Sequence, residues 1–315
     1  NTGGNMPKIL TAGEVLVEIM GTRKNQTFRE TGEFTGPYPS GAPAIFIDQA
    51  AKMGGNAGII SVIGNDDFGR INTDRLKKDG VDVSQVHISN EKTTAAAFVV
   101  YQESGSRDFI FTIKDSALQE LNYGKIDKSC LDGCEYFHIM GCSVFNENMI
   151  DLFNNLLPEL KGRGIKVTFD PNFRKEFMEN PRIKELIVKI MRNADIILPG
   201  EQELLDLTGM ETEKDAVKKL LEDGTVAVVV KRGDRGATLY TETEEISVDS
   251  VKVTEVDPTG AGDCFGGTFV SLVSQGYSYK EALFYANLAG AYSVTKQGPM
   301  EGNLTKEEID NIYKK

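Results

Sequence analysis

The sequence predicts a doubly wound α/β fold, in which helices cover both faces of a mostly parallel central sheet and a small second sheet forms a lid. A chain of 315 residues, 40% hydrophobic and 26% charged, is long enough for one such domain with a buried core. Short apolar runs alternate with longer amphipathic stretches, as in βαβ units. Residues 15–34 and 93–113 break this alternation, because strand patterns follow one another there without a helix between them.

The elements of the central sheet can be assigned in chain order. Runs with the composition of buried strands cover residues 8–12, 57–63, 136–140, 165–169, 194–198 and 226–230. Helical patterns lie between them at residues 44–53, 68–78, 149–160, 181–192 and 214–221. A further strand pattern over residues 251–256 leads into a glycine-rich turn and a helical run over residues 264–273. Alternation of this kind places helices on both faces of the sheet.

The two exceptional segments predict the small sheet. Residues 95–101 and 107–113 have strand patterns on either side of a polar turn at residues 103–106, which indicates a hairpin. We therefore expect a lid formed by about residues 14–38 and 93–115, within a single domain that spans residues 6–315. Residues 1–5 have no periodicity and are interpreted as the remnant of an expression tag.

Composition argues against several classes of function. The net charge of −12 disfavours a nucleic-acid-binding surface, which needs clustered Lys and Arg. No apolar run approaches the length that spans a membrane. The four cysteines lack CxxC spacing, which favours a reduced, cytoplasmic protein. A zinc site at Cys130, Cys134, His138 and Cys142 is the less favoured interpretation, since His138 lies within a run typical of a buried strand.

Residues 257–263, Asp-Pro-Thr-Gly-Ala-Gly-Asp, carry the clearest chemistry. Their small residues open a helix, so the N–H groups of Gly260, Ala261, Gly262 and Asp263 form an anion hole at the positive end of the helix dipole. Such donors suit a transferring phosphoryl group. Asp263 is the natural base for an attacking alcohol, with its carboxylate stabilised by the same N–H groups. The alternative is an ordinary helix cap. This explanation is weak, because all seven residues of the motif occur in the required sequence. The turn has neither Walker A nor dinucleotide-binding spacing.

This turn resembles the signature of the ribokinase-like, PfkB-type carbohydrate kinases. A second family signature is present upstream, in Gly-Gly-Asn-Ala-Gly at residues 54–58 and Asn-Asp-Asp-Phe-Gly at residues 65–69. The resemblance covers nearly the whole chain and is greatest to tagatose, fructose and 2-keto-3-deoxygluconate kinases. It implies ATP-dependent transfer of a phosphoryl group to a sugar hydroxyl, under a β-sheet lid.

The resemblance also assigns residues on the phosphate side. Asp263 matches the family's base, and Gly260, Ala261 and Gly262 match the turn that holds the transferred phosphate. The implied ATP contacts are Lys231 or Arg232 at the phosphates, Gly233 and Gly236 in the adjoining turn, and Asn287 at the adenine pocket. Glu203 matches an acid that organises Mg²⁺ through water, although Gly200 stands where the family has Asn. Asp257 matches a residue near a monovalent-cation site, which implies dependence on K⁺.

On the sugar side, the resemblance points to Glu18, Gly41, Ala42, Asn172 and Arg174, together with Asp263. Glu18 replaces the more frequent Asp, and a carboxylate there can accept hydrogen bonds from two hydroxyl groups. Ile113 stands where 2-keto-3-deoxygluconate kinases have an Arg for the substrate carboxylate, and Ile45 stands where Asn is typical.

A neutral ketohexose, tagatose or fructose, is therefore the preferred substrate. Three alternatives stay open: a 2-keto-3-deoxygluconate kinase, a nucleoside kinase, and a sugar-binding regulator without catalysis. The expected partners are the sugar and ATP, with a homodimer formed through the lid and with no nucleic acid or membrane.

Overall fold

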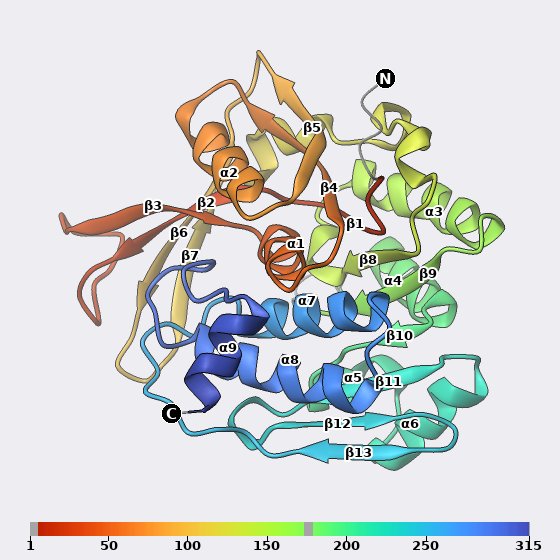
Figure 1. The fold of residues 1–315 in the computed structure, drawn as a ribbon. Coiled ribbons are helices and arrows are strands. Elements are labelled where there is room, and N and C mark those ends of the chain that lie inside the picture. Colours follow the sequence, from red (N-terminus) through yellow and green to blue (C-terminus); the bar gives the residue numbers. More distant parts are fainter. Residues whose placement is uncertain (1–5, 173–178, 315) are drawn as a thin grey trace.

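A computed structural model describes residues 6–172 and 179–314 and shows a large twisted sheet with helices on both faces (Figure 1). Within the described residues this sheet has nine strands. Their spatial order is β13 (Glu245–Val248), β12 (Ala237–Tyr240), β11 (Ala227–Lys231), β10 (Ile196–Ile197), β9 (Lys166–Asp170), β8 (Tyr136–Met140), β1 (Ile9–Ala12), β4 (Ala57–Gly64) and β5 (Asp82–Ser89). Neighbouring strands from β11 to β5 are parallel, whereas β12 and β13 are antiparallel.

The period of two along each strand divides the core into two layers. In β8, Phe137 and Ile139 belong to one buried cluster, whereas Tyr136 and Met140 belong to the other. Successive side chains of a strand point to opposite faces, so a strand that is buried throughout must meet helices on both sides. All five residues of β8 are buried.

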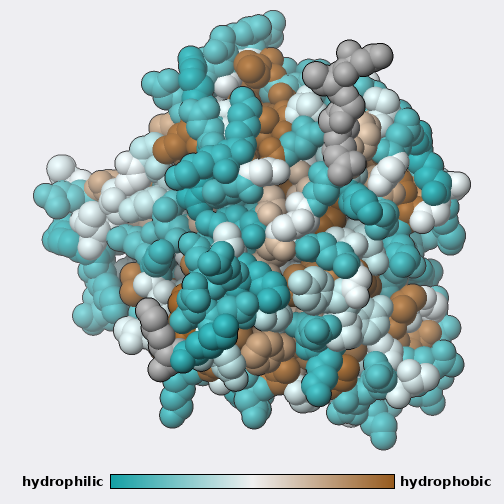
Figure 2. Space-filling view, viewed as in Figure 1, coloured by the Kyte–Doolittle hydropathy of each residue, from teal (hydrophilic) through white to brown (hydrophobic). Residues whose placement is uncertain are grey.

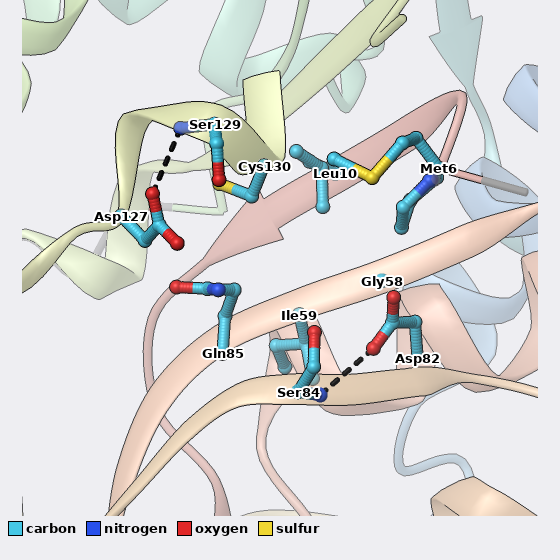
Figure 3. Close-up of a pocket in the computed structure, with 11 residues that line it drawn as sticks. Met6, Leu10, Gly58, Ile59, Asp82, Ser84, Gln85, Asp127, Ser129 and Cys130 are labelled. Atoms are coloured by element: carbon cyan, nitrogen blue, oxygen red, sulfur yellow. Dashed lines mark hydrogen bonds between the residues drawn. The ribbon is translucent and has the colours of Figure 1, made fainter. Parts of the chain in front are cut away.

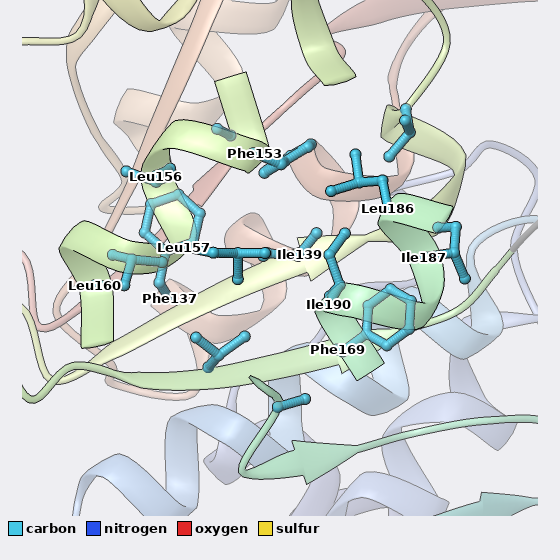
Figure 4. Packing of buried hydrophobic residues seen from close by; sticks show 14 of the residues in the cluster. Phe137, Ile139, Phe153, Leu156, Leu157, Leu160, Phe169, Leu186, Ile187 and Ile190 are labelled. Atoms are coloured by element: carbon cyan, nitrogen blue, oxygen red, sulfur yellow. The ribbon is translucent and has the colours of Figure 1, made fainter. Parts of the chain in front are cut away.

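The helices are divided between these two faces. They are α1 (Ala42–Lys52), α2 (Asp67–Lys78), α3 (Glu147–Gly162), α4 (Pro181–Asn193), α5 (Glu201–Thr208), α6 (Glu213–Glu222), α7 (Ala261–Ser274), α8 (Tyr279–Ser293) and α9 (Lys306–Tyr313). Side chains from α3, α4, α5 and α6 pack on one face, and Figure 4 shows α3 and α4 over Phe137, Ile139 and Phe169. Side chains from α1, α7, α8 and α9 pack on the other. The predicted doubly wound arrangement is confirmed.

A small separate sheet projects from one end of the molecule (Figure 1). Its strand order within the described chain is β3 (Phe34–Ser40), β2 (Leu16–Gly21), β6 (Ala95–Tyr101) and β7 (Arg107–Phe111). β6 and β7 form the expected antiparallel hairpin, in which Tyr101 pairs with Arg107. β2 and β6 pair in parallel, which joins the two segments that break the βα alternation.

One predicted element is wrong. Residues 251–256 contain no strand, although their composition predicts one. Instead of pairing with a strand, the N–H groups of Val256 and Asp257 both donate to the carbonyl of Val294 at the end of α8. The strands β5, β12 and β13 were not among the predicted elements, and they lie at the two edges of the sheet, where the apolar signal is weaker.

The face of the molecule in Figure 2 is mostly hydrophilic, with hydrophobic residues in separate spots. In the described part of the chain, no helix combines the length and apolar character that crossing a bilayer would require. The predicted tag remnant, residues 1–5, lies outside the described residues.

Candidate active site

Two cavities lie on either side of residues 257–263. The lid-side cavity, of ≈ 680 Å³, lies between the small sheet, the start of α1 and the start of α7. The α8-side cavity, of ≈ 730 Å³, lies between residues 231–236, residues 250–255 and helices α7 and α8. Both volumes are in the range of small-molecule sites.

The glycine-rich turn forms the wall between these cavities. Thr259, Gly260 and Asp263 line the lid-side cavity, while Pro258, Ala261 and Gly262 line the α8-side cavity. The N–H groups in the first turn of an α-helix have no acceptor within the helix. Donors at the start of α7 are therefore placed where a group passing from one cavity to the other would meet them.

At two glycines of the turn, an added side chain would enter space that other groups need. Gly260 is the N-cap of α7 with φ 83°, and a Cβ atom there would lie 2.8 Å from the carbonyl oxygen of Pro299. A Cβ atom on Gly262 would lie 3.4 Å from Nζ of Lys231. The space above Gly262 is thus next to an ammonium group, as an anion site requires.

Asp263 is a buried acid in the first turn of α7. Burial raises its pKa well above the ordinary value, and the negative charges of Asp170, Glu14 and Glu203 add to this effect, while Lys231 opposes it. The sequence predicts that the helix amides stabilise the carboxylate. The structure shows the opposite net direction, because desolvation and like charges dominate. A raised pKa makes the carboxylate a stronger proton acceptor once it is ionised.

The side chains of Lys231, the last residue of β11, and of the next residue, Arg232, point in different directions. Lys231 lines the α8-side cavity, and its Nζ lies 2.6 Å from Oδ2 of Asp170. Arg232 instead donates to Glu201 at 2.7 Å and to Glu213 at 2.5 Å. These contacts turn Arg232 away from the cavity, so of the two alternatives only Lys231 is placed to meet phosphate.

Two glutamates line the lid-side cavity. Glu18 is 4% exposed, and its Oε2 accepts a hydrogen bond from Ser40 at 3.2 Å, whereas Oε1 is buried without a partner in the described structure. The pKa of Glu18 is raised to about 7, mainly by burial and next by the charge of Asp257, against the smaller opposing effects of Ser40 and Arg107. An orphaned carboxylate oxygen at a cavity wall is suited to accept a ligand hydroxyl group.

Three further sugar-side predictions fall at the same cavity. Gly41, Ala42 and Asn172 all line it. Gly41 has φ 107°, and a Cβ atom there would collide with the carbonyl oxygen of Glu14, so the start of α1 closely approaches the segment that follows β1. Arg174 lies outside the described residues.

Asp257 joins the turn to both neighbouring segments. Its Oδ1 accepts from the N–H of Thr259 at 3.0 Å and from the hydroxyl of Tyr101 at 3.1 Å. Its Oδ2 accepts from the N–H of Gly298 at 3.0 Å. Since Tyr101 belongs to β6, the small sheet is connected to the glycine-rich turn.

Of the remaining nucleotide-side predictions, three residues line the α8-side cavity, and Glu203 lies outside its lining. Gly233, Gly236 and Asn287 line it, and the Asn287 side chain donates to the carbonyl of Asp249 at 2.8 Å. Glu203 accepts the N–H of Gly200 at 2.8 Å at the start of α5, and its charge reaches both Lys231 and Asp263.

The upstream signature, residues 54–69, lines neither of these cavities. A Cβ atom on Gly55 would lie 2.8 Å from the carbonyl oxygen of Ala50, so this glycine permits close packing behind α1. Gly58 lines a smaller cavity of ≈ 220 Å³ at the amino ends of β1 and β5 (Figure 3). The acids there, Asp82 and Asp127, each accept a backbone N–H two residues further on.

Several residues of the site were not among the predictions. Glu14 accepts hydrogen bonds from Ser143 at 2.7 Å and from Cys142 at 3.3 Å, at the wall of the lid-side cavity. Arg107 lines the same cavity and donates to the hydroxyl of Thr259 at 3.3 Å. Glu14 and Asp170 lie four and two positions before the predicted residues Glu18 and Asn172, which was a usable signal, whereas nothing local marks Arg107.

Known proteins resemble the chain over its whole length. Residues 6–306 match the pfkB family carbohydrate kinase family. Fructokinase-1 of Oryza sativa subsp. japonica is 31% identical over 97% of both chains. Among solved structures, an Escherichia coli protein described as a candidate ribokinase II, in complex with ATP and Mg²⁺, is 44% identical over 98% of this chain and 99% of its own, with a TM-score of 0.94. A double mutant of fructokinase from Vibrio cholerae O395, bound to fructose, ADP and potassium ion, is 25% identical over 97% of this chain and 98% of its own, with a TM-score of 0.84.

Proposed function

The chain belongs to the pfkB family of carbohydrate kinases and is an ATP-dependent sugar kinase, and from this premise we propose that its acceptor is a neutral ketohexose such as tagatose or fructose. The observation that carries the proposal is the division of residues 257–263 between two cavities. A sugar in the lid-side cavity and a nucleotide in the α8-side cavity would meet at this turn, which among the described residues is the segment that lines both cavities.

The chemistry follows from the groups at that boundary. Asp263 accepts the proton of the attacking sugar hydroxyl, whose oxygen forms a bond to the γ-phosphorus as the bond to the ADP oxygen breaks. The N–H groups at the start of α7 and the ammonium of Lys231 stabilise the charge on the transferring oxygens. The small sheet covers the acceptor and excludes water that would compete with the hydroxyl.

The α8-side cavity fits a nucleotide. Val251, Val253, Phe265 and Ala291 give it apolar walls for a base, and Lys231 lies at the end nearest the glycine-rich turn.

Magnesium fits the site as a companion of the phosphates. The negative charges of Asp170, Glu14 and Glu203 act on Asp263 and the Lys231 cation opposes them, so a divalent cation would help this acidic site to hold two charged phosphates. No cluster of three His, Cys, Asp or Glu side chains suited to a metal occurs among the described residues. Glu203 would hold Mg²⁺ through water, and the ion would neutralise phosphate oxygens.

Dependence on K⁺ through Asp257 is a further part of the proposal. Its buried carboxylate anchors Thr259 and Gly298, so a cation beside it would set the position of the anion hole. Replacing K⁺ by tetramethylammonium in the assay buffer, with the ionic strength held constant, should lower kcat. An unchanged kcat would remove K⁺ from the proposal.

The choice of a neutral sugar rests on the wall of the lid-side cavity. Glu14, Glu18 and Asn172 offer acceptors and an amide for hydroxyl groups, and Ile113 and Phe111 are apolar. A sugar carboxylate would lie near these acids, which disfavours it.

One observation favours a second candidate, 2-keto-3-deoxygluconate. Arg107 lines the lid-side cavity, although Ile113 occupies the position where an Arg was sought. A guanidinium group at this place can pair with a carboxylate of the substrate.

A substrate panel in a coupled ADP assay tests the proposal. The panel contains fructose, tagatose, aldoses, 2-keto-3-deoxygluconate and nucleosides. We expect the highest kcat/KM with a ketohexose. A higher kcat/KM with 2-keto-3-deoxygluconate or with a nucleoside would overturn the proposal of a neutral ketohexose. If no sugar is turned over while calorimetry detects tight sugar binding, the chain is a regulator.

Pairing of two copies through the small sheet also stays a proposal. Phe34 on β3 and Phe109 and Ile110 on β7 are exposed apolar residues on its two edge strands. Sedimentation equilibrium would distinguish a dimer from a monomer.

A further inference from the structure

Asp170 is a buried carboxylate between the two cavities that the mechanism above does not use. It ends β9, is 1% exposed, and lines neither cavity. An acid buried to this extent is rare unless it is paired. Its two oxygens have different partners, one on the phosphate side of the site and one on the sugar side.

The first partner is Lys231, two strands away. β10 separates β9 from β11 but contains only Ile196 and Ile197, and both longer strands extend beyond it. Lys231 ends β11, with its N–H bound to the carbonyl of Pro199 at 2.8 Å. Its side chain crosses the end of the short strand, so that Nζ reaches Oδ2 of Asp170 at 2.6 Å.

The second partner is the backbone of the sugar side. Oδ1 of Asp170 accepts the N–H of Asn172 at 3.1 Å. Asn172 has φ 27°, a conformation that few residues other than glycine adopt, and it lines the lid-side cavity. The Asp170 carboxylate therefore holds both a strained sugar-side residue and the phosphate-side ammonium.

The charges around Asp263 are arranged about this pair. Asp170 on β9, Glu14 after β1 and Glu203 on α5 face Asp263 with negative charge, and Lys231 on β11 faces it with positive charge. Burial lowers the pKa of Lys231, but Asp170, Glu203 and Asp263 together raise it, so the amine stays protonated.

We propose that Asp170 is a positioning residue for phosphoryl transfer, which holds the Lys231 ammonium over Gly262 and fixes its distance from the Asn172 side of the acceptor site. The proposal rests on the role assigned to Lys231 at the phosphates. Without the Asp170 charge, the ammonium is free to turn toward Glu203 or Asp263 and leaves the anion site.

Asp170→Asn, Lys231→Met and the double variant test the inference. Asn keeps an oxygen for the Asn172 N–H but removes the charge. We expect Asp170→Asn to lower kcat by about 10²-fold, in line with misplacement of a catalytic group. It should also weaken magnesium-free ADP binding in calorimetry. In the double variant, the loss should be far smaller than the product of the single losses, because both substitutions remove the same interaction.

The pH profile separates positioning from a purely structural role. Removing the Asp170 charge favours the ionised form of Asp263, so the acidic limb of kcat/KM should move to lower pH. Removing the Lys231 charge should move it to higher pH. Asp195→Asn is the matched control, since Asp195 accepts the N–H of Val167 at 2.8 Å at the opposite end of β9. This variant should keep the wild-type profile.

The outcomes are distinguishable. If Asp170→Asn melts at a lower temperature but keeps the wild-type acidic limb and ADP affinity, Asp170 is only structural and the inference is wrong. If Lys231→Met keeps wild-type ADP affinity and kcat, the role proposed for Lys231 fails first. Asp170→Glu, which restores the charge, should recover part of kcat only if the ion pair matters.

Discussion

The two cavities are assembled from different parts of the chain. The residues of the α8-side cavity come from one C-terminal stretch, residues 231–294. Those of the lid-side cavity are spread from Glu14 to Asp263 and come from the small sheet, from segments that follow strands of the central sheet, and from the starts of α1 and α7. A site built from consecutive segments can be recognised from local motifs, whereas a site whose residues are dispersed along the chain cannot. Substitutions in the small sheet could therefore change the substrate without altering the segment proposed for phosphoryl transfer.

The strongest test of this division is Asp263→Asn, at the boundary of the two cavities. Loss of the base should lower kcat by about 10²–10⁴-fold, because Asp263 is the acid that lines the lid-side cavity at the start of α7, beside the proposed anion hole. The substitution preserves size, so ATP affinity in calorimetry and the melting temperature should stay close to wild type. Wild-type turnover would show that Asp263 is not the base.

Gly262→Ala tests the phosphate side alone. The added methyl group would lie 3.4 Å from Nζ of Lys231, in the space assigned to the phosphoryl group. We expect kcat to fall by about 10-fold to 10²-fold, since small displacements of reacting groups are costly. The sugar affinity should not change.

Gly266→Ala is the matched control in the same helix. Its methyl group would make ordinary contacts with Phe46, at 3.4 and 3.5 Å. Equal losses in the two variants would point to a general effect on α7, not to the anion site.

Glu18→Gln tests the sugar side. Loss of a charged acceptor should raise the KM for the sugar about tenfold, or about 1.4 kcal/mol, with little effect on the KM for ATP. If the KM for ATP rises equally, the two cavities are not separate in function.

The same variant gives a signed prediction for stability. The folded pKa of Glu18 is raised from 4.5 to about 7, so its stabilising effect is complete below pH 4.5 and is lost as the pH rises through 7. At pH 8, Glu18→Gln should therefore be more stable than wild type by up to about 3 kcal/mol. At pH 4 the difference should vanish. Urea unfolding at both pH values measures it.

Tyr101→Phe should have the smallest effect. It removes the hydroxyl that contacts Asp257 at 3.1 Å and Thr259 at 3.3 Å, and so uncouples the small sheet from the turn. We expect the loss of this hydrogen bond to cost about 1 kcal/mol of transition-state stabilisation, which corresponds to a severalfold lower kcat/KM for the sugar. Steady-state kinetics would detect it, and a tenfold change in the KM for ATP alone would contradict the assignment of Tyr101 to the lid side.

Sequence reasoning succeeded where the signal is local. The buried strand at residues 136–140 was predicted with its observed bounds, because four of its five residues are apolar and consecutive positions share this character on both sides of His138. The strand expected at residues 251–256 was wrong, because its apolar side chains Val251 and Val253 line a cavity, and the segment joins neither sheet of the described structure. Composition alone does not distinguish these two environments.

By itself, the sequence determined the α/β alternation and the small sheet, and it supplied the proposal that residues 257–263 carry the phosphoryl transfer, since each depends on the order of neighbouring residues. Only the tertiary structure decided that Lys231 meets Asp170, that Arg232 turns away, and that Arg107 reaches the acceptor cavity. The residues in these contacts are far apart in the sequence. Lys231 and Asp170 are 61 positions apart, Arg232 and Glu201 are 31 apart, and Arg107 and Thr259 are 152 apart. The formation of these contacts depends on which strands lie side by side, and no local pattern encodes that order.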